Sequence, residues 1–388
     1  MKVIFSTYET KEIGGSYLRS FSLAQGLADL GHEVTLWTSA KTITLLPTIS
    51  EEKGMKIIES IGLFPYRFRK GGYDPFDVIF RTTIILFSKC KIIHSFNHRP
   101  AASLPGLFKS LFYPQTKWFL DWADLWGKGG VADQRHGPLS FITANVDLYT
   151  EYLFIKLAGS ITAISDNLIK KSLKIRGNKK KTNYLPIGAN IGDIKPLSKK
   201  ESRKKLKLPL KKKIIVYLFV GTYDLKLLAQ VFIEINKIRD DVNLLLLGPD
   251  APEFYDQFDK HPSLLKKVIH PGLISRKLLS YYLAAGDIML LPFTNREINL
   301  GRSPNKLGDY LAAGRPIAAN PTGEVKKMLT KDEVGILVSE NPTKFASSVE
   351  KLLNQPKKMD LLGKNARLLA ESLSWGSVAK QLERFYLE

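Results

Sequence analysis

A segment in the second half of the chain combines the groups that proteins use to hold a diphosphate. Gly301, Arg302 and Ser303 supply open backbone, a guanidinium with several N–H donors and a hydroxyl. Pro304 is expected to begin a helix, with Lys306 in its first turn. The N–H groups of a helix N-terminus attract phosphate, and arginine and lysine add charge-assisted hydrogen bonds. The segment therefore predicts a diphosphate-binding site.

Asp309 lies about one helical turn beyond Lys306. A carboxylate at this position can accept hydrogen bonds from two neighbouring hydroxyls of a ribose. Residues Ala312, Ala313 and Gly314 would keep the helix slim where it packs and would then end it. The alternative is a capped amphipathic helix with ordinary surface charges.

Glycine also follows the first strand-like run of the chain. We expect the N–H groups at Gly14, Gly15 and Ser16 to bind phosphate where the next helix begins. A simple tight turn is the alternative. The sequence lacks the complete GxGxxG pattern, and Thr38-Ser39 follows the second strand where a dinucleotide site needs an acidic residue. An NAD site is therefore disfavoured.

Two later strand-like runs also end at glycine. Gly221 is followed five residues later by Lys226, which can neutralise a diphosphate as a point charge. The alternative for Lys226 is a solvated lysine in the first turn of a helix. Gly272 and Leu273 come at the end of the other run, and we expect them to belong to the same binding site. All these loops would lie beyond the carboxyl ends of strands, where open parallel sheets bind ligands.

Alternating strands and helices are expected to position these loops. Lys2–Thr7 and Glu33–Thr38 are β-prone, and Ser16–Leu30 between them repeats apolar residues at helical spacing. A second series begins with Lys213–Val220 and ends in the mostly helical segment Thr343–Leu387. This alternation predicts an α/β fold with two Rossmann-like, doubly wound, mostly parallel sheets.

The length and composition predict two domains. A chain of 388 residues is enough for roughly two domains of about 100–200 residues. A lysine-rich stretch with two prolines begins near residue 190 and is typical of an exposed linker. We therefore expect an N-terminal domain at 1–190 and a C-terminal domain at 191–370.

The charge of the chain is strongly positive. There are 58 Lys and Arg against 37 Asp and Glu, which gives a net charge of +21. Such a surface attracts nucleic acid, anionic lipid or phosphorylated substrates, and a solvated lysine-rich surface is the alternative. No apolar run approaches the ~20 residues that span a membrane, and no secretory signal is expected. The single cysteine, Cys90, is consistent with a reducing cytoplasm.

The order of several motifs resembles glycosyltransferase family 4, the retaining transferases of the GT-B fold. The matching segments are GGSYLRSFSLAQGLADLGHEVTLWT, KIIHSFN, FLDWADLW, YLPIGANIGDIKP, SPNKLGDYLAAGRPIAA and SWGSVAKQLERFY. The resemblance spans nearly the whole chain. It implies two domains facing across a cleft, with a C-terminal helix at 371–388 that crosses back to the first domain.

The resemblance also assigns roles to residues. The expected donor-binding residues are Gly14, Gly15, Ser16, Gly221, Lys226, Gly272, Leu273, Gly301, Ser303, Lys306 and Asp309, and the expected catalytic residues are Asp121, Asp124 and Arg302. For each of the two aspartates, a buried carboxylate that caps a loop is the alternative. The leaving group would be a nucleoside diphosphate, stabilised by cations and helix N-termini without a metal or other cofactor.

The chain departs from the family pattern in the donor site. The family has two glutamates separated by seven residues, and here Gly301 and Asp309 stand in their places. The arginine that usually follows Gly221 is replaced by Thr222, and Arg302 could supply the missing positive charge. The contacts between the protein and the donor sugar are therefore expected to differ from those in the family.

The acceptor is expected at the first domain. Leu63–Lys91 mixes aromatic residues with Arg67, Arg69, Arg81 and other cations, which suits an anionic membrane interface. A loop followed by a buried amphipathic helix is the alternative. The resulting hypothesis is a cytoplasmic, peripheral membrane enzyme of hexosyltransferase type. It would move a sugar from a UDP- or GDP-sugar to a cell-envelope glycan or polyprenyl-linked acceptor.

Two other functions remain open at this level. The first is a catalytically weak or inactive GT-B relative that binds a nucleotide sugar or a partner, which the missing glutamate and arginine suggest. The second is a basic nucleic-acid-binding protein, which is suggested only by the charge of +21. No nucleic-acid-binding motif supports it.

Overall fold

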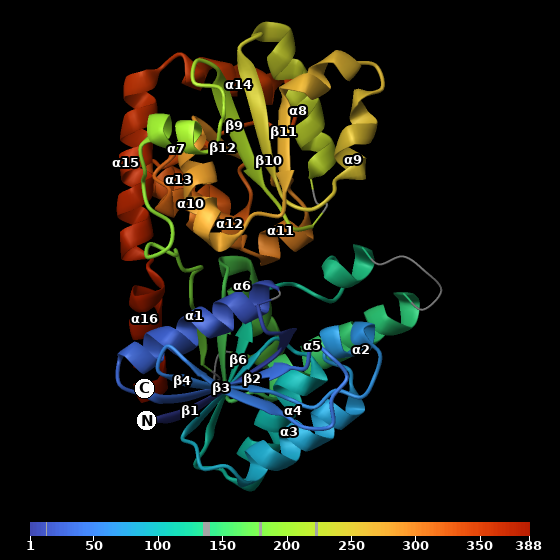
Figure 1. Cartoon of the computed structure of the whole chain (residues 1–388). Helices are drawn as coiled ribbons and strands as arrows, with labels where there is room; N and C mark the ends of the chain where they lie inside the picture. The colour runs from blue at the N-terminus through green and yellow to red at the C-terminus, as the bar shows by residue number, and fades with distance from the viewer. Residues whose placement is uncertain (13, 135–139, 178–180, 222–223) are drawn as a thin grey trace. The chain divides into compact units, whose positions relative to one another are not determined.

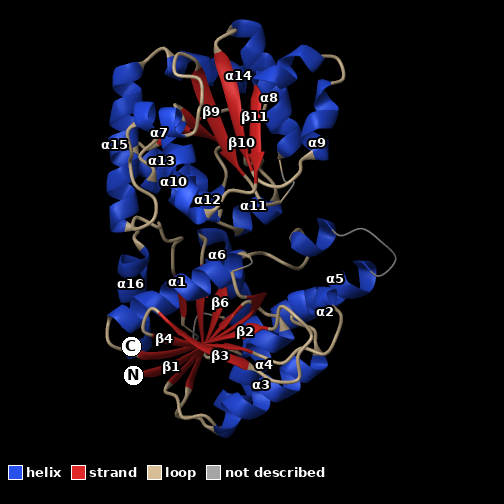
Figure 2. Ribbon diagram, in the orientation of Figure 1, coloured by secondary structure: helices blue, strands red, loops and turns tan. Residues whose placement is uncertain are grey.

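The computed structural model describes residues 1–12, 14–134, 140–177, 181–221 and 224–388 (Figure 1). The chain divides into two compact units. Unit 1 contains Met1–Ile187, Arg296–Ser303 and Trp375–Glu388, and unit 2 contains Gly188–Asn295 and Pro304–Ser374. Each unit has one largely parallel sheet with helices on both faces, which confirms the predicted Rossmann-like α/β fold class (Figure 2).

The sheet of unit 1 has the strand order β3-β4-β2-β1-β5-β6-β7-β8. The strands are β1 (Lys2–Thr10), β2 (Glu33–Ser39), β3 (Thr48–Glu52), β4 (Met55–Glu59), β5 (Ile92–Phe96), β6 (Lys117–Trp122), β7 (Ser160–Ala163) and β8 (Thr182–Tyr184). The β3–β4 edge pair is antiparallel and the other pairs are parallel. Every residue of β5 is buried, as expected for an apolar strand covered on both faces.

Helices cover both faces of this sheet. They are α1 (Gly15–Asp29), α2 (Tyr66–Lys70), α3 (Pro75–Phe87), α4 (Pro100–Phe112), the 3₁₀ turn η1 (Val131–Gln134), α5 (Ser140–Leu157), α6 (Asp166–Arg176), α11 (Glu297–Gly301) and α16 (Trp375–Leu387). Val3 and Phe5 of β1 belong to one core with residues of α1 and α16. On the other face, the Ser6 hydroxyl donates to the carbonyl of Ala101 on α4. The C-terminal helix α16 is therefore part of unit 1.

The sheet of unit 2 has the order β11-β10-β9-β12-β13-β14, with parallel neighbours throughout. Its strands are β9 (Lys213–Leu218), β10 (Val242–Leu247), β11 (Val268–Gly272), β12 (Ile288–Leu291), β13 (Ile317–Ala319) and β14 (Gly335–Leu337). This is the doubly wound order of a dinucleotide-binding Rossmann sheet, and ligands of such sheets bind where the order reverses. In unit 2 that point lies between β9 and β12.

The helices of unit 2 pack on both faces of its sheet. They are α7 (Lys199–Lys205), α8 (Leu225–Ile238), α9 (Pro252–Tyr255), the 3₁₀ turns η2 (Asp256–Phe258) and η3 (Pro262–Lys267), α10 (Arg276–Ala285), α12 (Asn305–Ala312), α13 (Gly323–Asp332), α14 (Pro342–Leu353) and α15 (Pro356–Ser372). Helices α8 and α14 share a continuous apolar core with β9 and β10. Helix α12 packs against α15.

The segment Leu63–Lys91 differs from the sequence expectation in one respect. Arg69 and Arg81, expected among cations at a membrane interface, are buried. The Arg69 guanidinium donates to the carbonyls of Phe64 and Ala40. Arg81 forms an ion pair with Asp77 one turn earlier on α3. These two side chains stabilise unit 1 from inside and are not available to lipid headgroups.

The Asp77–Arg81 pair is fully enclosed. The Arg81 Nε and Nη2 atoms donate to the two Asp77 oxygens at 3.0 and 2.8 Å, and Nη1 donates to the Thr7 carbonyl at 2.6 Å. Ser39 donates its hydroxyl hydrogen to Asp77. Removing one member of a buried pair leaves the other charge uncompensated, which costs about 3–5 kcal/mol.

We therefore expect Arg81→Leu to lower the free energy of unfolding of unit 1 by about 3–5 kcal/mol. All five tryptophans lie in unit 1, so tryptophan fluorescence during urea denaturation follows that unit. The matched control is Arg67→Leu on the exposed side of α2, where a change within about 0.5 kcal/mol is expected. An equal loss in the two variants would contradict a structural role for the buried pair.

Candidate active site

The carboxyl edge of the unit 2 sheet carries several predicted donor-binding residues. Gly221 follows β9, and Gly272 ends β11 with a φ of +82° that favours glycine. Lys226 is exposed in the first turn of α8, and the Leu273 side chain is exposed just after β11. Thr222 lies outside the described residues. These positions surround the carboxyl ends of β9 and its neighbours, as the sequence predicted.

Helix α12 brings Lys306 to the point where the strand order reverses. The Lys306 Nζ atom lies 4.2 Å from the centroid of the Tyr217 ring on β9, a cation–π distance. One turn later, the Tyr310 hydroxyl accepts a 2.7 Å hydrogen bond from the N–H of Leu218 at the end of β9. The helix is therefore fixed to β9, and its ammonium group lies where Rossmann sheets bind phosphate.

Asp309 lies on the same helix and has an unusual environment. Its side chain is partly buried and makes no hydrogen bond or ion pair with any residue that the structure describes. Burial raises the pKa of Asp309 to about 6, and Arg276 opposes this shift electrostatically. A carboxylate that lacks protein donors in a desolvated position gains by accepting hydrogen bonds from a ligand. This agrees with a hydroxyl-binding role.

The structure divides the predicted Gly301–Asp309 motif. Gly301, Arg302 and Ser303 fall in unit 1, whereas Lys306 and Asp309 fall in unit 2. Within unit 1, the Ser165 hydroxyl donates to the Gly301 carbonyl at 3.2 Å. The sequence alone predicted one continuous site, because nothing in it shows that the chain passes from one unit to the other between Ser303 and Pro304.

Packing explains why residue 301 is glycine. A Cβ atom at Gly301 would lie 2.8 Å from the Leu125 Cβ and 3.5 Å from the Leu168 side chain. No side chain fits there without a backbone shift. The neighbouring Ser303 hydroxyl is buried and has no hydrogen-bond partner among the described residues, so it can still bond a ligand.

Asp121 ends β6 in unit 1 and is fully bonded to the protein. The Arg19 Nε and Nη2 atoms donate to its two oxygens at 2.8 and 3.0 Å. The Thr162 hydroxyl donates to it at 2.7 Å. The side chains of Asp121 and Arg19 are almost completely buried. This arrangement favours the alternative of a structural carboxylate for Asp121.

Asp124 lies a short distance beyond β6 and is better placed for chemistry. Its side chain is partly exposed, and burial raises the pKa of Asp124 to about 6. The nearby positive charge of Arg302 opposes this shift. Asp121 also acts on Asp124 electrostatically, so the structure brings all three predicted catalytic residues near one another within unit 1.

Sequence reasoning missed Glu9, which occupies the predicted phosphate loop. Its Oε2 atom accepts a 2.6 Å hydrogen bond from the N–H of Tyr17 in the first turn of α1. A Cβ at Gly14 would lie only 2.2 Å from this carboxylate, so glycine is required there. Burial raises the pKa of Glu9 to about 7, and the charge of Asp124 raises it further. The protein's own carboxylate thus lies against Gly14 and bonds the N–H that follows Ser16, where the sequence predicted a phosphate.

Glu151 holds the loop that carries Asp124. It accepts hydrogen bonds from the indole of Trp122 and from the backbone N–H groups of Trp126 and Gly127, at 2.8–2.9 Å. Burial raises the pKa of Glu151 to about 7. Because Glu151 lies on α5, far from this loop in the sequence, no local pattern could have indicated its role.

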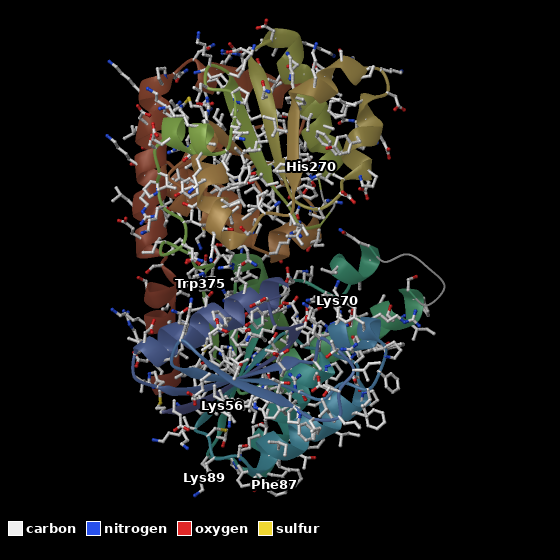
Figure 3. The ribbon with its side chains drawn as sticks, viewed as in Figure 1. Lys56, Lys70, Phe87, Lys89, His270 and Trp375 are labelled. Carbon is white, nitrogen blue, oxygen red and sulfur yellow. The ribbon has the colours of Figure 1, made fainter. Side chains whose placement is uncertain are left out.

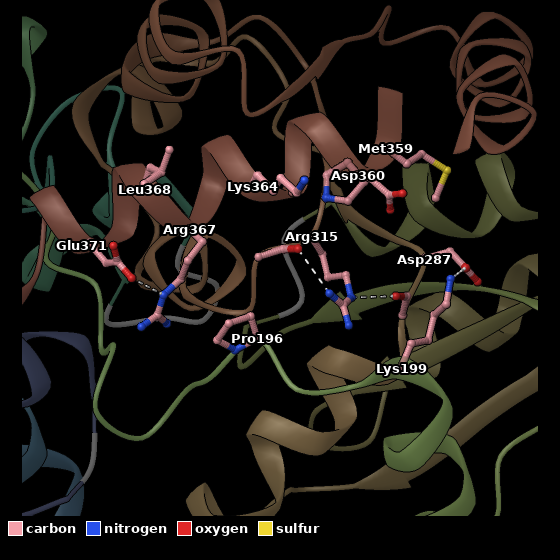
Figure 4. A pocket seen from close by; sticks show the side chains of 14 residues that line it. Pro196, Lys199, Asp287, Arg315, Met359, Asp360, Lys364, Arg367, Leu368 and Glu371 are labelled. Carbon is pink, nitrogen blue, oxygen red and sulfur yellow. Dashed lines mark hydrogen bonds and ion pairs between the residues drawn. The ribbon is translucent and has the colours of Figure 1, made fainter. Parts of the chain in front are cut away.

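A separate cavity of about 660 Å³ opens in unit 2 (Figure 4). Asp287 and Pro316, at the amino ends of β12 and β13, help to line it. It therefore lies at the opposite edge of the sheet from Lys306. Arg315 in its wall donates to the carbonyls of Leu197 and Ala284, and Arg367 donates to those of Ile194 and Ala312. These arginines mainly hold backbone segments together.

The described part of the chain shows neither a metal-binding cluster nor a membrane-spanning helix. There, no three or more His, Cys, Asp or Glu side chains are grouped so that they could hold a metal ion. No helix of the described residues has the length and apolar character needed to cross a membrane.

Known proteins resemble this chain both in sequence and in fold. Residues 215–355 match the model of the family Glycosyl transferases group 1. The putative teichuronic acid biosynthesis glycosyltransferase TuaH of Bacillus subtilis is 25% identical over 285 residues, which are 73% of this chain and 70% of TuaH.

Two solved structures are similar over almost the whole chain. Sucrose-phosphate synthase from Thermosynechococcus elongatus has a TM-score of 0.79 and 19% identity, and covers 99% of this chain and 98% of its own. Anabaena HepE, solved with UDP and glucose, has a TM-score of 0.71 and 13% identity, with 99% of each chain covered. At these identities the structures show the shared fold alone.

The family match begins in β9 and spans the strands that surround Lys306, so it includes Lys226, Lys306 and Asp309 of unit 2. The relative TuaH extends the likeness over most of the chain, and the GT-B fold extends over nearly all of it. We conclude that the chain is a glycosyltransferase of the GT-B type.

Proposed function

We propose that the chain is a retaining family 4 glycosyltransferase that moves a sugar from a nucleoside-diphosphate sugar to a cell-envelope glycan or a lipid-linked acceptor. The observation that carries this proposal is the placement of Lys306 and Asp309 on α12 beside β9. Two relatives also support it. The structure of HepE was determined in complex with UDP and glucose, and the name of TuaH refers to teichuronic acid biosynthesis.

On the donor side, the proposed work is to stabilise a leaving diphosphate. Negative charge grows on this group as the bond to the sugar breaks, and fixed positive groups lower the barrier. The Lys306 ammonium and the N–H groups that begin α12 would bind this charge, and Lys226 would add a second cation. Asp309 would accept the ribose hydroxyls. In this proposal no metal or cofactor takes part.

On the acceptor side, Asp124 is the proposed contact. With a pKa of about 6, it is ionised near neutral pH and can accept a hydrogen bond from an acceptor hydroxyl. Arg302, which interacts with it electrostatically, would keep the carboxylate ionised. A lipid-linked acceptor would place the enzyme on the inner face of the cell membrane.

One observation favours a second candidate, a relative that binds a nucleotide sugar without efficient transfer. The family's first glutamate is absent, and packing against Leu125 leaves no room for it at position 301. Both candidates predict donor binding, but only the first predicts turnover. Transfer assays with a panel of acceptors therefore separate them.

Donor binding can be tested with a thermal-shift screen of UDP-, GDP- and dTDP-sugars. A ligand that binds the folded state alone raises the apparent stability. We expect one of these sugars to raise the melting temperature, and Lys306→Ala to weaken its binding about 10–100-fold, because a charge-assisted contact is lost. The matched control is Lys266→Ala, an exposed lysine at the opposite edge of the sheet. No shift with any of these sugars would refute the proposed donor.

Donor binding should also depend on pH through Asp309. Its raised pKa of about 6 means that the carboxyl is mostly protonated at pH 5 and mostly ionised at pH 7.5. Only the ionised form accepts hydrogen bonds with both oxygens. Calorimetry should therefore show donor affinity rising as pH increases through about 6, and Asp309→Asn should bind more weakly with a flat profile. The same rise in the variant would exclude Asp309 as its source.

The missing glutamate offers a third test. Because a side chain at position 301 would collide with Leu125, we expect Gly301→Glu to reduce transfer activity rather than to restore a family-like site. Gly376→Ala, where a Cβ meets nothing within 4 Å, is the control for a glycine replacement in unit 1. Donor turnover is the measurement, and faster turnover in Gly301→Glu would show that the site lacks only this carboxylate.

A further inference from the structure

Helix α3 turns a stripe of large apolar side chains to solvent. Ile79 and Phe87 are 65% and 73% exposed, and Phe76 and Ile84 lie on the same side. The opposite side of the helix carries the buried residues Asp77, Arg81 and Ile85. Figure 3 shows Phe87 projecting from the end of α3, with Lys89 just beyond it. An amphipathic helix normally points its apolar stripe inward, so this second stripe needs an explanation.

Helix α4 continues the exposed apolar area. It packs beside α3 and exposes Phe108, Leu111 and Phe112, with Leu111 at 65%. The Lys109 Nζ atom donates to the carbonyls of Leu86 and Ser88 at the end of α3. This bond fixes the C-terminal end of α3 to α4, where Phe87 and Leu111 are exposed.

Helix α5 adds the third part of this area. It packs beside α4 and exposes Phe141 at 78% together with Tyr149, Tyr152, Leu153 and Leu157. These side chains lie opposite its buried residues, which include Phe154 and Ile155. We call the exposed apolar residues of α3, α4 and α5 together the apolar face.

The charges of these three helices are distributed unevenly. Their carboxylates are Asp77, Asp147 and Glu151, and all three are buried. No Asp or Glu occurs between residues 78 and 120. The cations Lys89, Lys91 and Lys156 are exposed on α5 or just after α3. The apolar face therefore presents no carboxylate, and lysines lie on it or next to it.

Exposed apolar areas larger than a few hundred Å² usually mark an interaction site. A second copy of the chain is a poor occupant, because each copy has a net charge of +21 and two lysine-bearing faces would repel. An anionic bilayer matches both features, since apolar side chains enter the headgroup region while lysines contact the lipid phosphates.

We propose that the apolar face of α3, α4 and α5 docks on an anionic membrane surface. The docking would place unit 1, the proposed acceptor side, against the bilayer. Its purpose rests on the proposed lipid-linked acceptor, but the binding itself does not depend on any sugar. This surface differs from the sequence expectation, because it extends to α4 and α5 and excludes Arg69 and Arg81.

The test uses the full chain and co-flotation with vesicles of phosphatidylcholine, with or without phosphatidylglycerol. We expect binding to the anionic vesicles that weakens as salt increases. The triple variant Ile79→Ser, Phe87→Ser, Leu111→Ser should bind at least ~10-fold more weakly, because three apolar side chains that would enter the bilayer are lost. The matched control is Leu361→Ser, Leu368→Ser on α15, which are 54% and 64% exposed in unit 2 and should not change binding.

A second variant tests the charge. Replacing Lys89, Lys91 and Lys156 by glutamine should weaken binding to anionic vesicles by about fivefold per lysine and reduce its salt dependence. The nucleotide-sugar thermal shift should be unchanged in these variants, because none of the residues lies in unit 2. Loss of that shift alone would concern the proposed donor and not the membrane surface.

Three outcomes would overturn the proposal. One is equal binding of the apolar-face variant and the α15 control. Another is no binding of the native chain to anionic vesicles. The third is a dimer, detected by light scattering, that the triple variant abolishes while vesicle binding is absent, because the face would then join two copies of the chain.

Discussion

The buried ion pair between Arg19 and Asp121 is the interaction on which unit 1 depends. The Arg19 guanidinium also donates to the carbonyls of Leu185 and Pro186. One side chain therefore ties α1, the end of β6 and the segment after β8 together. An arginine without these partners would carry an uncompensated charge in the interior. The loop that holds Asp124 begins at the end of β6, so its position depends on this pair.

The carboxylates of unit 1 differ in the partners that surround them. Asp121 has a guanidinium and a hydroxyl as donors. Burial raises the pKa values of Asp124 and Glu9 to about 6 and about 7, and at Asp124 the charge of Arg302 opposes this shift. Groups with raised pKa values in a desolvated position are common in active sites. This difference, rather than the position in the sequence, distinguishes Asp124 from Asp121 as the candidate for chemistry.

Much of the fold and part of the site could be predicted from the sequence. Strand and helix periodicity indicated two doubly wound sheets, and the glycines after β9 and β11 indicated their carboxyl edges. Lys306 and Asp309 could be proposed together because one helix carries both within a short segment. Glu9, Arg19 and Glu151 were missed because their partners are distant in the sequence or lie across a turn. Burial of Arg69 and Arg81 could not be foreseen, because a basic residue near aromatics suits a membrane interface and an internal ion pair equally well.

The net charge of +21 has a clearer meaning once the burial pattern is known. In unit 1 the buried carboxylates Asp77 and Asp121 pair with buried arginines, and such pairs cancel inside the protein. The surface therefore keeps the whole excess of basic residues, and three neighbouring helices expose none of their carboxylates. A solvated lysine-rich surface explains the charge but not the large apolar side chains beside it. Water solvates ammonium groups well and apolar groups poorly, so their joint exposure favours a surface that accepts both.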